Sequence, residues 1–195
     1  RLRTIAQRER EGARQRARQN GSGAVTTPTL SAPGIVLRPL VPDDAEALFA
    51  AHGDEQTHHY WSGPAHKDIA ETRAYIEATL NMKGALVWAI TEDGGEALGR
   101  VALFVPREGV GEFGIIMRRD AVGRGLASKA IKLIEDHAFT TLGLHRLAAD
   151  VDPDNNASLS LFLRAGFARE GLLRGNWKTH LGVRDSVILG KLREN

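Results

Sequence analysis

The residues best placed to do chemistry form a glycine-rich turn, residues 122–128 (VGRGLAS), just before the longest expected helix. Glycine lets a backbone approach a ligand closely and take conformations that are closed to other residues. The first N–H groups of a helix have no partner within it, and the helix dipole adds partial positive charge there. The turn therefore predicts a cradle for an anion such as a pyrophosphate.

Two other phosphate-binding motifs fit this turn less well. A P-loop requires Lys followed by Ser or Thr after its last glycine, whereas here Lys129 follows Ser128. A dinucleotide fingerprint requires Gly or Ala at the position of Ser128, and it belongs near the first strand of its domain. A glycine-rich turn with a purely structural role is the remaining alternative.

The elements that position this turn follow from hydrophobic periodicity and turn residues. We expect strands over 35–39, 85–91, 97–105, 111–117, 146–151, 168–176 and 182–192, and helices over 42–52, 67–81, 126–142 and 157–165. The longest helix has apolar residues at helical spacing: Leu126, Ala130, Ile131, Ile134 and Ala138. This mixture predicts an α/β fold in which a mixed sheet carries helices on its faces.

The first 33 residues are expected to lie outside that domain. Residues 1–20 hold seven Arg and two Glu and thus carry +5, which leaves −3 for the other 175 residues. Gly, Ser, Thr and Pro dominate residues 21–34, as in a linker. We divide the chain into a basic tail with a flexible linker (1–33) and one domain (34–195). The tail is either an RNA-binding segment or, more simply, a solvated extension.

Composition argues against several classes of protein. Cys is absent, so this chain has neither disulfides nor a thiol nucleophile. No apolar run approaches the length of a membrane span, and the arginine-rich start lacks the apolar core of a signal peptide. A cytoplasmic location is the expectation that follows.

Metal and serine-hydrolase chemistry have little support in the sequence. Of the seven His, only His58 and His59 are adjacent, and no H-E-x-x-H pattern occurs, so we predict no metal site. No G-x-S-x-G elbow is present. Tyr60, Trp61 and Trp177 are candidates for an acceptor pocket, although aromatic side chains more often pack in a core.

Several segments resemble, in order, the GNAT superfamily of acetyltransferases and in particular its RimJ/RimL-like branch. They are residues 35–40 (IVLRPL), 60–64 (YWSGP), 112–131 (EFGIIMRRDAVGRGLASKAI), 142–174 with a D-P-x-N-x-x-S turn, and 183–192 (VRDSVILGKL). The resemblance covers about 35–192 and is more specific in combination than any single motif.

The resemblance implies the GNAT acyl-CoA N-acyltransferase fold, a central mixed sheet splayed between its fourth and fifth strands, here 111–117 and 146–151. Acetyl-CoA would lie in that cleft as co-substrate. The coenzyme-binding residues implied are Ile115, Ile116, Met117, Val122, Gly123, Arg124, Gly125, Leu126, Ala127, Asn155 and Ser158. Val122 departs from the Gln or Arg of many members, but a backbone cradle does not depend on that side chain.

The implied reaction is direct attack of an amine on the thioester. A backbone N–H at residue 116 or 117 would stabilise the oxygen that gains charge. The resemblance offers Glu112 and Asp150 as bases acting through water, and Ser158 as a donor to the leaving sulfur, where other members have a Tyr at the place of Phe162. The structural alternatives are strand-edge acids paired with Arg and a first-turn Ser capped by Asn155.

The acceptor amine remains open at this level. An α-amino group has a pKa of about 7.7–8.0, against about 10.4 for lysine, so a protein N-terminal amine would need only a weak base. The RimJ/RimL-like resemblance suggests such an acceptor. A small amine, such as an aminoglycoside or a polyamine, is the alternative, and a catalytically silent acyl-CoA-binding module is a third interpretation.

Overall fold

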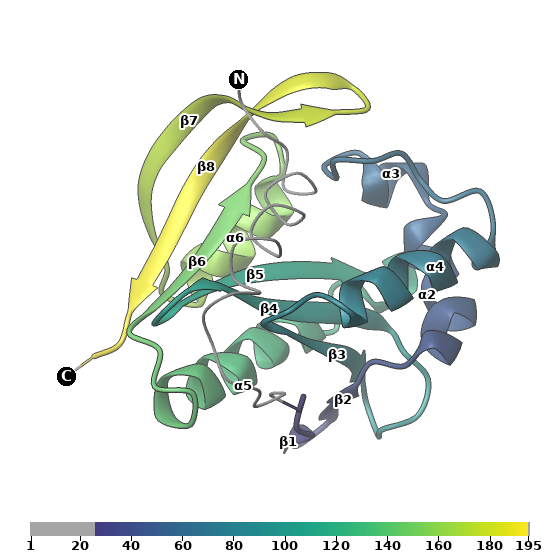
Figure 1. Ribbon diagram of the computed structural model, residues 1–195, viewed down its shortest axis with the longest axis horizontal. Helices are drawn as coiled ribbons and strands as arrows, with labels where there is room; N and C mark the ends of the chain where they lie inside the picture. Colours follow the sequence, from purple (N-terminus) through teal and green to yellow (C-terminus); the bar gives the residue numbers. More distant parts are fainter. Residues whose placement is uncertain (1–25, 195) are drawn as a thin grey trace.

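The computed structural model describes residues 26–194, which form an eight-stranded sheet in the order β1-β2-β3-β4-β5-β6-β8-β7 (Figure 1). The strands are Leu30–Ala32 (β1), Ile35–Pro39 (β2), Ala85–Thr91 (β3), Gly99–Arg107 (β4), Val110–Met117 (β5), Arg146–Val151 (β6), Ala168–Thr179 (β7) and Gly182–Leu192 (β8). The pair β5–β6 is parallel and the other neighbouring pairs are antiparallel. The predicted mixed α/β fold is confirmed.

Helices cover both faces of this sheet (Figure 1). They are Ala45–His52 (α2), Glu55–His58 (α3), Ile69–Leu80 (α4), Leu126–Thr140 (α5) and Asn156–Arg164 (α6), with 3-10 turns at Pro42–Asp44 (η1) and Arg119–Ala121 (η2). Helix α4 begins where the Asp68 carboxylate accepts the N–H of Glu71 at 2.8 Å. Within the described residues, no helix has the length and hydropathy needed to cross a membrane.

Alternation along the central strands separates two apolar cores. Trp88 and Ile90 of β3 pack with the apolar stripe of α5, whereas Val87 and Ala89 pack with α2 and α4 on the opposite face. The stripe predicted for α5 is fully buried: Leu126, Ala130, Ile131, Ile134 and Ala138. The longest helix is thereby fixed against the sheet, and its first turn is fixed beside the end of β5.

Strand β1 lies inside the stretch whose composition indicates a linker. Leu30–Ala32 pairs with the start of β2, and Trp88 donates its indole N–H to the carbonyl of Pro28 at 2.6 Å. Ordered contacts therefore begin before residue 34. The basic tail over residues 1–20 lies outside the described residues, so the division of the chain at residue 33 stays a prediction.

The sheet splits between β5 and β6. Their parallel register runs from Val110 opposite Arg146 to Phe113 opposite Ala149 and stops there. Strand β5 then continues to Met117, while β6 stays paired with β8 on its other side. The two strands diverge (Figure 1), as expected for the splayed sheet.

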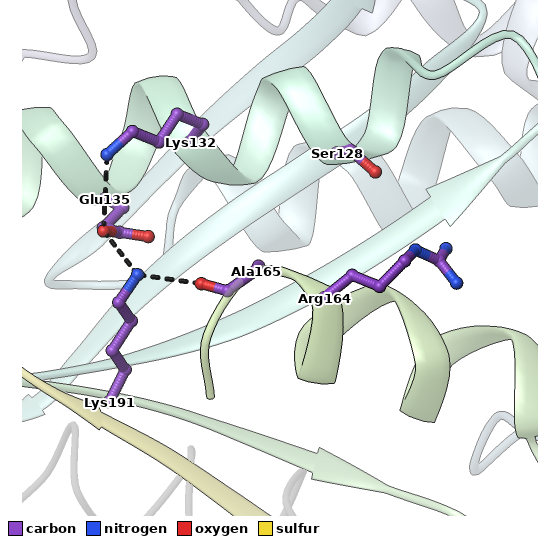
Figure 2. Close-up of a pocket in the computed structure, with 6 residues that line it drawn as sticks. All are labelled: Ser128, Lys132, Glu135, Arg164, Ala165 and Lys191. Atoms are coloured by element: carbon purple, nitrogen blue, oxygen red, sulfur yellow. Dashed lines mark hydrogen bonds and ion pairs between the residues drawn. The ribbon is translucent and has the colours of Figure 1, made fainter. Parts of the chain in front are cut away.

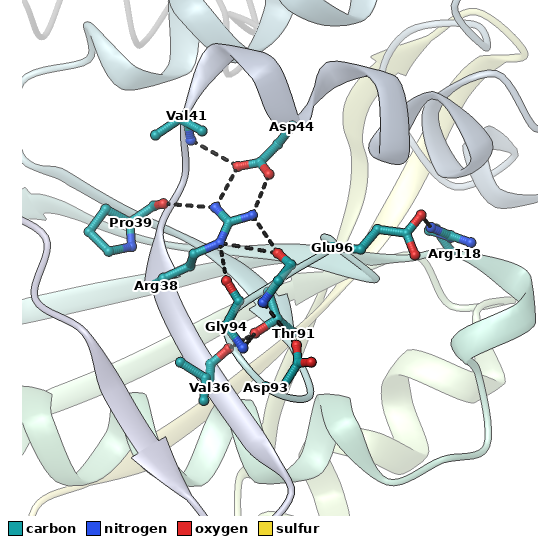
Figure 3. Close-up of polar contacts among 11 residues, drawn as sticks. Val36, Arg38, Pro39, Val41, Asp44, Thr91, Asp93, Gly94, Glu96 and Arg118 are labelled. Carbon is teal, nitrogen blue, oxygen red and sulfur yellow. Dashed lines mark hydrogen bonds and ion pairs between the residues drawn. The ribbon is translucent and has the colours of Figure 1, made fainter.

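A partly buried ion pair ties strand β2 to the rest of the domain (Figure 3). Arg38 of β2 makes two parallel bonds to the Asp44 carboxylate, at 2.6 and 2.9 Å. Its guanidinium also donates to the carbonyl oxygens of Gly94 and Gly95 in the β3–β4 turn, at 3.0 and 2.8 Å. One side chain thus joins β2, η1 and a turn more than 50 residues away.

We predict that Asp44→Ala lowers the free energy of unfolding by about 2–4 kcal/mol, because it leaves the partly buried Arg38 without its carboxylate. The neighbouring Asp43→Ala is the matched control. Its ion pair with Arg73 is exposed, so stability should stay nearly unchanged. Urea unfolding of both variants measures the difference, and equal midpoints would contradict this role for the ion pair.

Candidate functional site

A short segment, Arg118 and η2, connects the end of β5 to the glycine-rich turn and is held by hydrogen bonds. Arg118 follows β5 and donates to Glu96 at 2.7 Å and to Asp120 at 2.6 Å. Its own N–H donates to the carbonyl of Leu98 at 2.9 Å. These contacts fix η2, so the turn begins at a defined distance from the strand edge.

The turn has the geometry of an anion cradle. Gly123 and Gly125 have φ of 85° and 77°, and a Cβ built on either would meet nothing within 4 Å. Among the described residues, no acceptor is found for the N–H groups of residues 123–128, which include the first turn of α5. Six successive amides are therefore available to an anion, and none depends on the exposed side chain of Val122.

The edge of β5 continues this backbone surface into the cleft. Residues 114–117 have no partner in β6, so their backbone groups on that side face the opening. Ile116 is buried toward α2 and α4, while Ile115 and Met117 pack against the α5 side. The structure thus brings the strand-edge residues and the turn predicted to hold the coenzyme into one continuous stretch.

The two predicted acids flank the opening from opposite sides. Glu112 pairs with Ala148 in register, and Asp150 lies two residues further along β6, so both side chains point to the same face of the sheet. Both residues are exposed. The Asp150 carboxylate accepts from the amide of Asn176 at 3.0 Å and from the indole of Trp177 at 2.9 Å. A bound amine on this face would have a carboxylate on either side.

The turn after β6 gives Asn155 a structural role. Its side-chain oxygen accepts the N–H of Ser158 at 3.1 Å and caps α6. Among the described residues, the half-buried Ser158 hydroxyl has no hydrogen-bond partner, so it can donate to a ligand. Phe162 is a core residue packed against Phe113 and Phe167.

Residues 60–62, which we call the strap, connect the two sides of the opening. The hydroxyl of Tyr60 donates to the carbonyl of Asp154 at 3.3 Å, and the N–H of His180 donates to the carbonyl of Ser62 at 3.1 Å. The strap follows α3, whereas its partners lie after β6 and in the β7–β8 turn. It therefore bounds the acceptor side of the cleft and places Trp61 there.

Three histidines gather beneath the strap, although their spacing in the sequence gives no sign of it. One nitrogen from each of His52, His58 and His66 lies within 4.8 Å of the others. His52 Nδ1 lies 3.1 Å from His58 Nε2, and His58 Nδ1 lies 3.3 Å from the carbonyl of Gly63. On its other side, His52 Nε2 accepts from Arg100 Nε at 3.4 Å. The result is a chain of hydrogen bonds through neutral rings.

This arrangement does not suit a metal ion. A metal lies close to the plane of each ligating imidazole, yet the rings of His52 and His66 are stacked, 7° from parallel with centroids 4.8 Å apart. Parallel stacked planes do not meet at one ion. The Arg100 guanidinium adds a positive charge at the same place. Burial, together with Arg100, lowers the pKa of His52 to about 2, and burial also lowers the pKa of His58 and His66.

A groove between α5 and α6 extends from the glycine-rich turn (Figure 2). It measures about 460 Å³ and is lined by Ser128, Lys132, Glu135, Arg164, Ala165 and Lys191. Lys191 bonds to the buried Glu135 carboxylate and to the carbonyl of Ala165, at 2.7 and 2.8 Å. Ser128 and Arg164 lie toward the end nearer the turn. The groove offers further cationic side chains next to the cradle, which periodicity alone does not indicate.

The family model and two similar proteins all describe acetyltransferases. Residues 35–168 match the model of the acetyltransferase (GNAT) domain. The chain is 29% identical over 147 residues to the spermidine N(1)-acetyltransferase of Escherichia coli K12, covering 73% of this chain and 77% of that protein. It is also 29% identical over 153 residues to the uncharacterized N-acetyltransferase YoaA of Bacillus subtilis, covering 75% of this chain and 86% of that protein.

Solved structures agree with the fold. A probable GNAT acetyltransferase from Chromobacterium violaceum superposes with a TM-score of 0.79 at 24% identity, over 90% of this chain and 91% of that one. A putative ribosomal-protein-serine acetyltransferase from Vibrio cholerae superposes with a TM-score of 0.73 at 23% identity, over 87% of this chain and all of that one. At these identities the likeness concerns the fold alone.

We predict that stability falls as the pH drops from 6.5 to 5, and that His52→Asn makes this fall shallower. Unfolded histidines take up protons below about pH 6.5, whereas folded His52 stays neutral. Each such proton difference costs up to about 1.4 kcal/mol per pH unit. Urea unfolding across that range measures the slope, with His180→Gln at an exposed turn as control. Equal slopes in wild type and His52→Asn would contradict a buried neutral imidazole.

Proposed function

The chain belongs to the GNAT acetyltransferase family and is an N-acetyltransferase that uses acetyl-CoA, and from this premise we propose that it acetylates a primary amine held between β5 and β6. The observation that carries the proposal is the continuous backbone surface made by the unpaired edge of β5 and the glycine-rich turn. Amides for which no acceptor is found among residues 26–194 line this surface, and they support the binding of a diphosphate and of the arm that carries the thioester.

The described residues fit that co-substrate. The pyrophosphate would accept hydrogen bonds from the amides of Gly123 to Ala127, and the pantetheine would pair with the edge formed by Ile115, Ile116 and Met117. The glycines leave room for close approach. Acetyl-CoA, when bound, supplies an activated acyl group. The chain must orient it, stabilise the carbonyl oxygen and accept a proton from the amine.

Glu112 and Asp150 are the groups that would receive that proton, directly or through one water. They face the same side of the sheet from the two strands that part. Asp150 is held in place by two neutral donors, Asn176 and Trp177, which orient its carboxylate. The N–H of Ile116 or Met117 would stabilise the oxygen, and the Ser158 hydroxyl would donate to the departing sulfur.

The acceptor we propose first is an α-amino group, as at the N-terminus of a protein. An α-amino group is already partly neutral near pH 7.5, so it needs less help in losing a proton than a lysine does. The RimJ/RimL-like resemblance supports this choice, and such an acceptor and a cytoplasmic location stay predictions.

A polyamine is the second candidate. Two exposed acids on one face of the cleft would attract a polycation. The match to the spermidine N(1)-acetyltransferase of E. coli points the same way. A panel of N-terminal peptides, spermidine and aminoglycosides, assayed by thiol release, separates the two acceptors. If the protein binds the coenzyme but releases no thiol with any of these amines, it is a silent acyl-CoA-binding module.

We predict that Gly125→Ala weakens acetyl-CoA binding about tenfold or more, because a residue with a Cβ resists the left-handed backbone that aims the amides. Gly143→Ala is a matched control at the far end of α5, with φ of 66° and open space around its Cβ. Both variants should lose similar stability, by about 1–2 kcal/mol. Titration calorimetry measures binding, and equal affinities in the two variants would remove the cradle from the site.

We predict that Glu112→Gln or Asp150→Asn lowers kcat on an accepted amine about 10²-fold near pH 7, since one of them takes the proton. The loss should shrink as the pH approaches the pKa of the amine, because the free base then needs no proton acceptor. Glu108→Gln, an exposed acid in the β4–β5 turn, is the control. Ser158→Ala should have a smaller effect. Full rates in all three site variants would show that positioning alone carries the step.

A further inference from the structure

The side chain of Arg100 is the most unusual charged group among the described residues. It lies on β4, is 1% exposed, and points to the face covered by α2 and α4. Its Nη2 donates to the hydroxyl of Tyr75 at 2.5 Å and its Nε to His52 at 3.4 Å. The third nitrogen, Nη1, is buried and has no hydrogen-bond partner within residues 26–194.

In the part of the chain that the structure describes, no carboxylate compensates this charge. Among residues 26–194, no Asp or Glu oxygen lies within 4.0 Å of the guanidinium nitrogens. Its neighbours are neutral: the rings of Trp61 and Tyr75 have centroids 5.4 and 4.9 Å from Cζ, and His52 and His66 stay uncharged. A buried cation without a counter-ion is strongly destabilising, and cation–π contacts offset only part of that cost.

Register places this cation beside the reacting centre of the proposed function. Arg100 pairs with Ile116 in the β4–β5 ladder, so the two Cα atoms are about 5 Å apart and their side chains share a face. That face also carries Glu112 and Asp150. Trp61 and Tyr75, which lie over the guanidinium, are only half-buried, so they are what separates it from solvent on this side.

We propose that Arg100 is an anion site in the acceptor wall, and that the acceptor amine carries a carboxylate a few bonds from its nitrogen. The amine would lie in the β5–β6 opening near Ile116 and lose its proton through water to Glu112 or Asp150, and the carboxylate would reach Nη1 after Trp61 or Tyr75 turns aside. Free amino acids and peptides with an acidic first residue share this chemistry. The inference rests on the proposed function and favours a carboxylate-bearing amine over a polycation.

Matched acceptors test this directly in the wild-type protein. Thiol release is measured with peptides that begin with Asp and with the same peptides that begin with Asn, and with an amino acid and its carboxamide. Rates are compared at equal concentrations of free amine. We expect kcat/KM at least about tenfold higher for the carboxylate member of the pair that the enzyme accepts. A ratio of one or below in both pairs, or spermidine as the best acceptor, overturns the proposal.

The variant Arg100→Gln should bring that ratio to about one while the dissociation constant of acetyl-CoA is unchanged. Arg100→Lys, which keeps the charge but loses the planar fork, should give an intermediate ratio and guards against misfolding of the Gln variant. Equal losses for the acid and the amide would show that Arg100 has a structural role only, with an internal water at Nη1.

A binding measurement keeps the inference separate from turnover. Propionate should raise the thermal midpoint of the wild-type protein above that in propionamide at matched ionic strength, and Arg100→Gln should remove the difference. Equal midpoints in wild type overturn the anion site even if amines are acetylated. Stabilisation by propionate without acetylation of any amine would overturn the proposed function and leave the anion site standing.

Discussion

The whole site depends on where β5 and β6 stop pairing. A parallel pair of strands normally satisfies its backbone groups along its full length, and unpaired edges within a sheet are costly. Here pairing ends at Phe113 and Ala149, and the β8 ladder keeps β6 in place beyond that point. The unpaired backbone groups of β5 and the turn amides that lack an acceptor among the described residues both face the same opening. A single extended ligand with regular polar groups can satisfy both.

The cradle and the strands around it could be predicted because their causes are local. Left-handed glycines at 123 and 125 and a buried stripe along α5 are visible as residue types at fixed spacings. The splay itself was not derivable from periodicity. It came from a resemblance across several segments, since the end of a strand pairing depends on partners far apart in the sequence.

What could not be predicted depends on contacts between distant segments. Strand β1 is short, and the Pro and Thr residues beside it have the composition of a linker. Its order comes from pairing with β2 and from the hydrogen bond of Trp88 to Pro28, both of which are distant in the sequence or depend on the fold. The histidine cluster combines α2, α3 and the loop after the strap, so no spacing rule applies to it. In the sequence, Arg100 looks like an ordinary basic residue of a strand, and only the packing of helices on the central strand β4 shows that its side chain is buried.

The neutral histidines explain how a buried guanidinium is tolerated beside a cleft that must attract an amine. A carboxylate partner from the chain would cancel the charge of Arg100 and close the site to anions. One imidazole nitrogen, from His52, and the Tyr75 hydroxyl instead hold the guanidinium in place without neutralising it. The wall therefore keeps a positive charge on the same face of the sheet as the two acids of the β5–β6 opening. Such an arrangement is complementary to a dipolar ligand, whereas a purely cationic one would have to pay for its approach to Arg100.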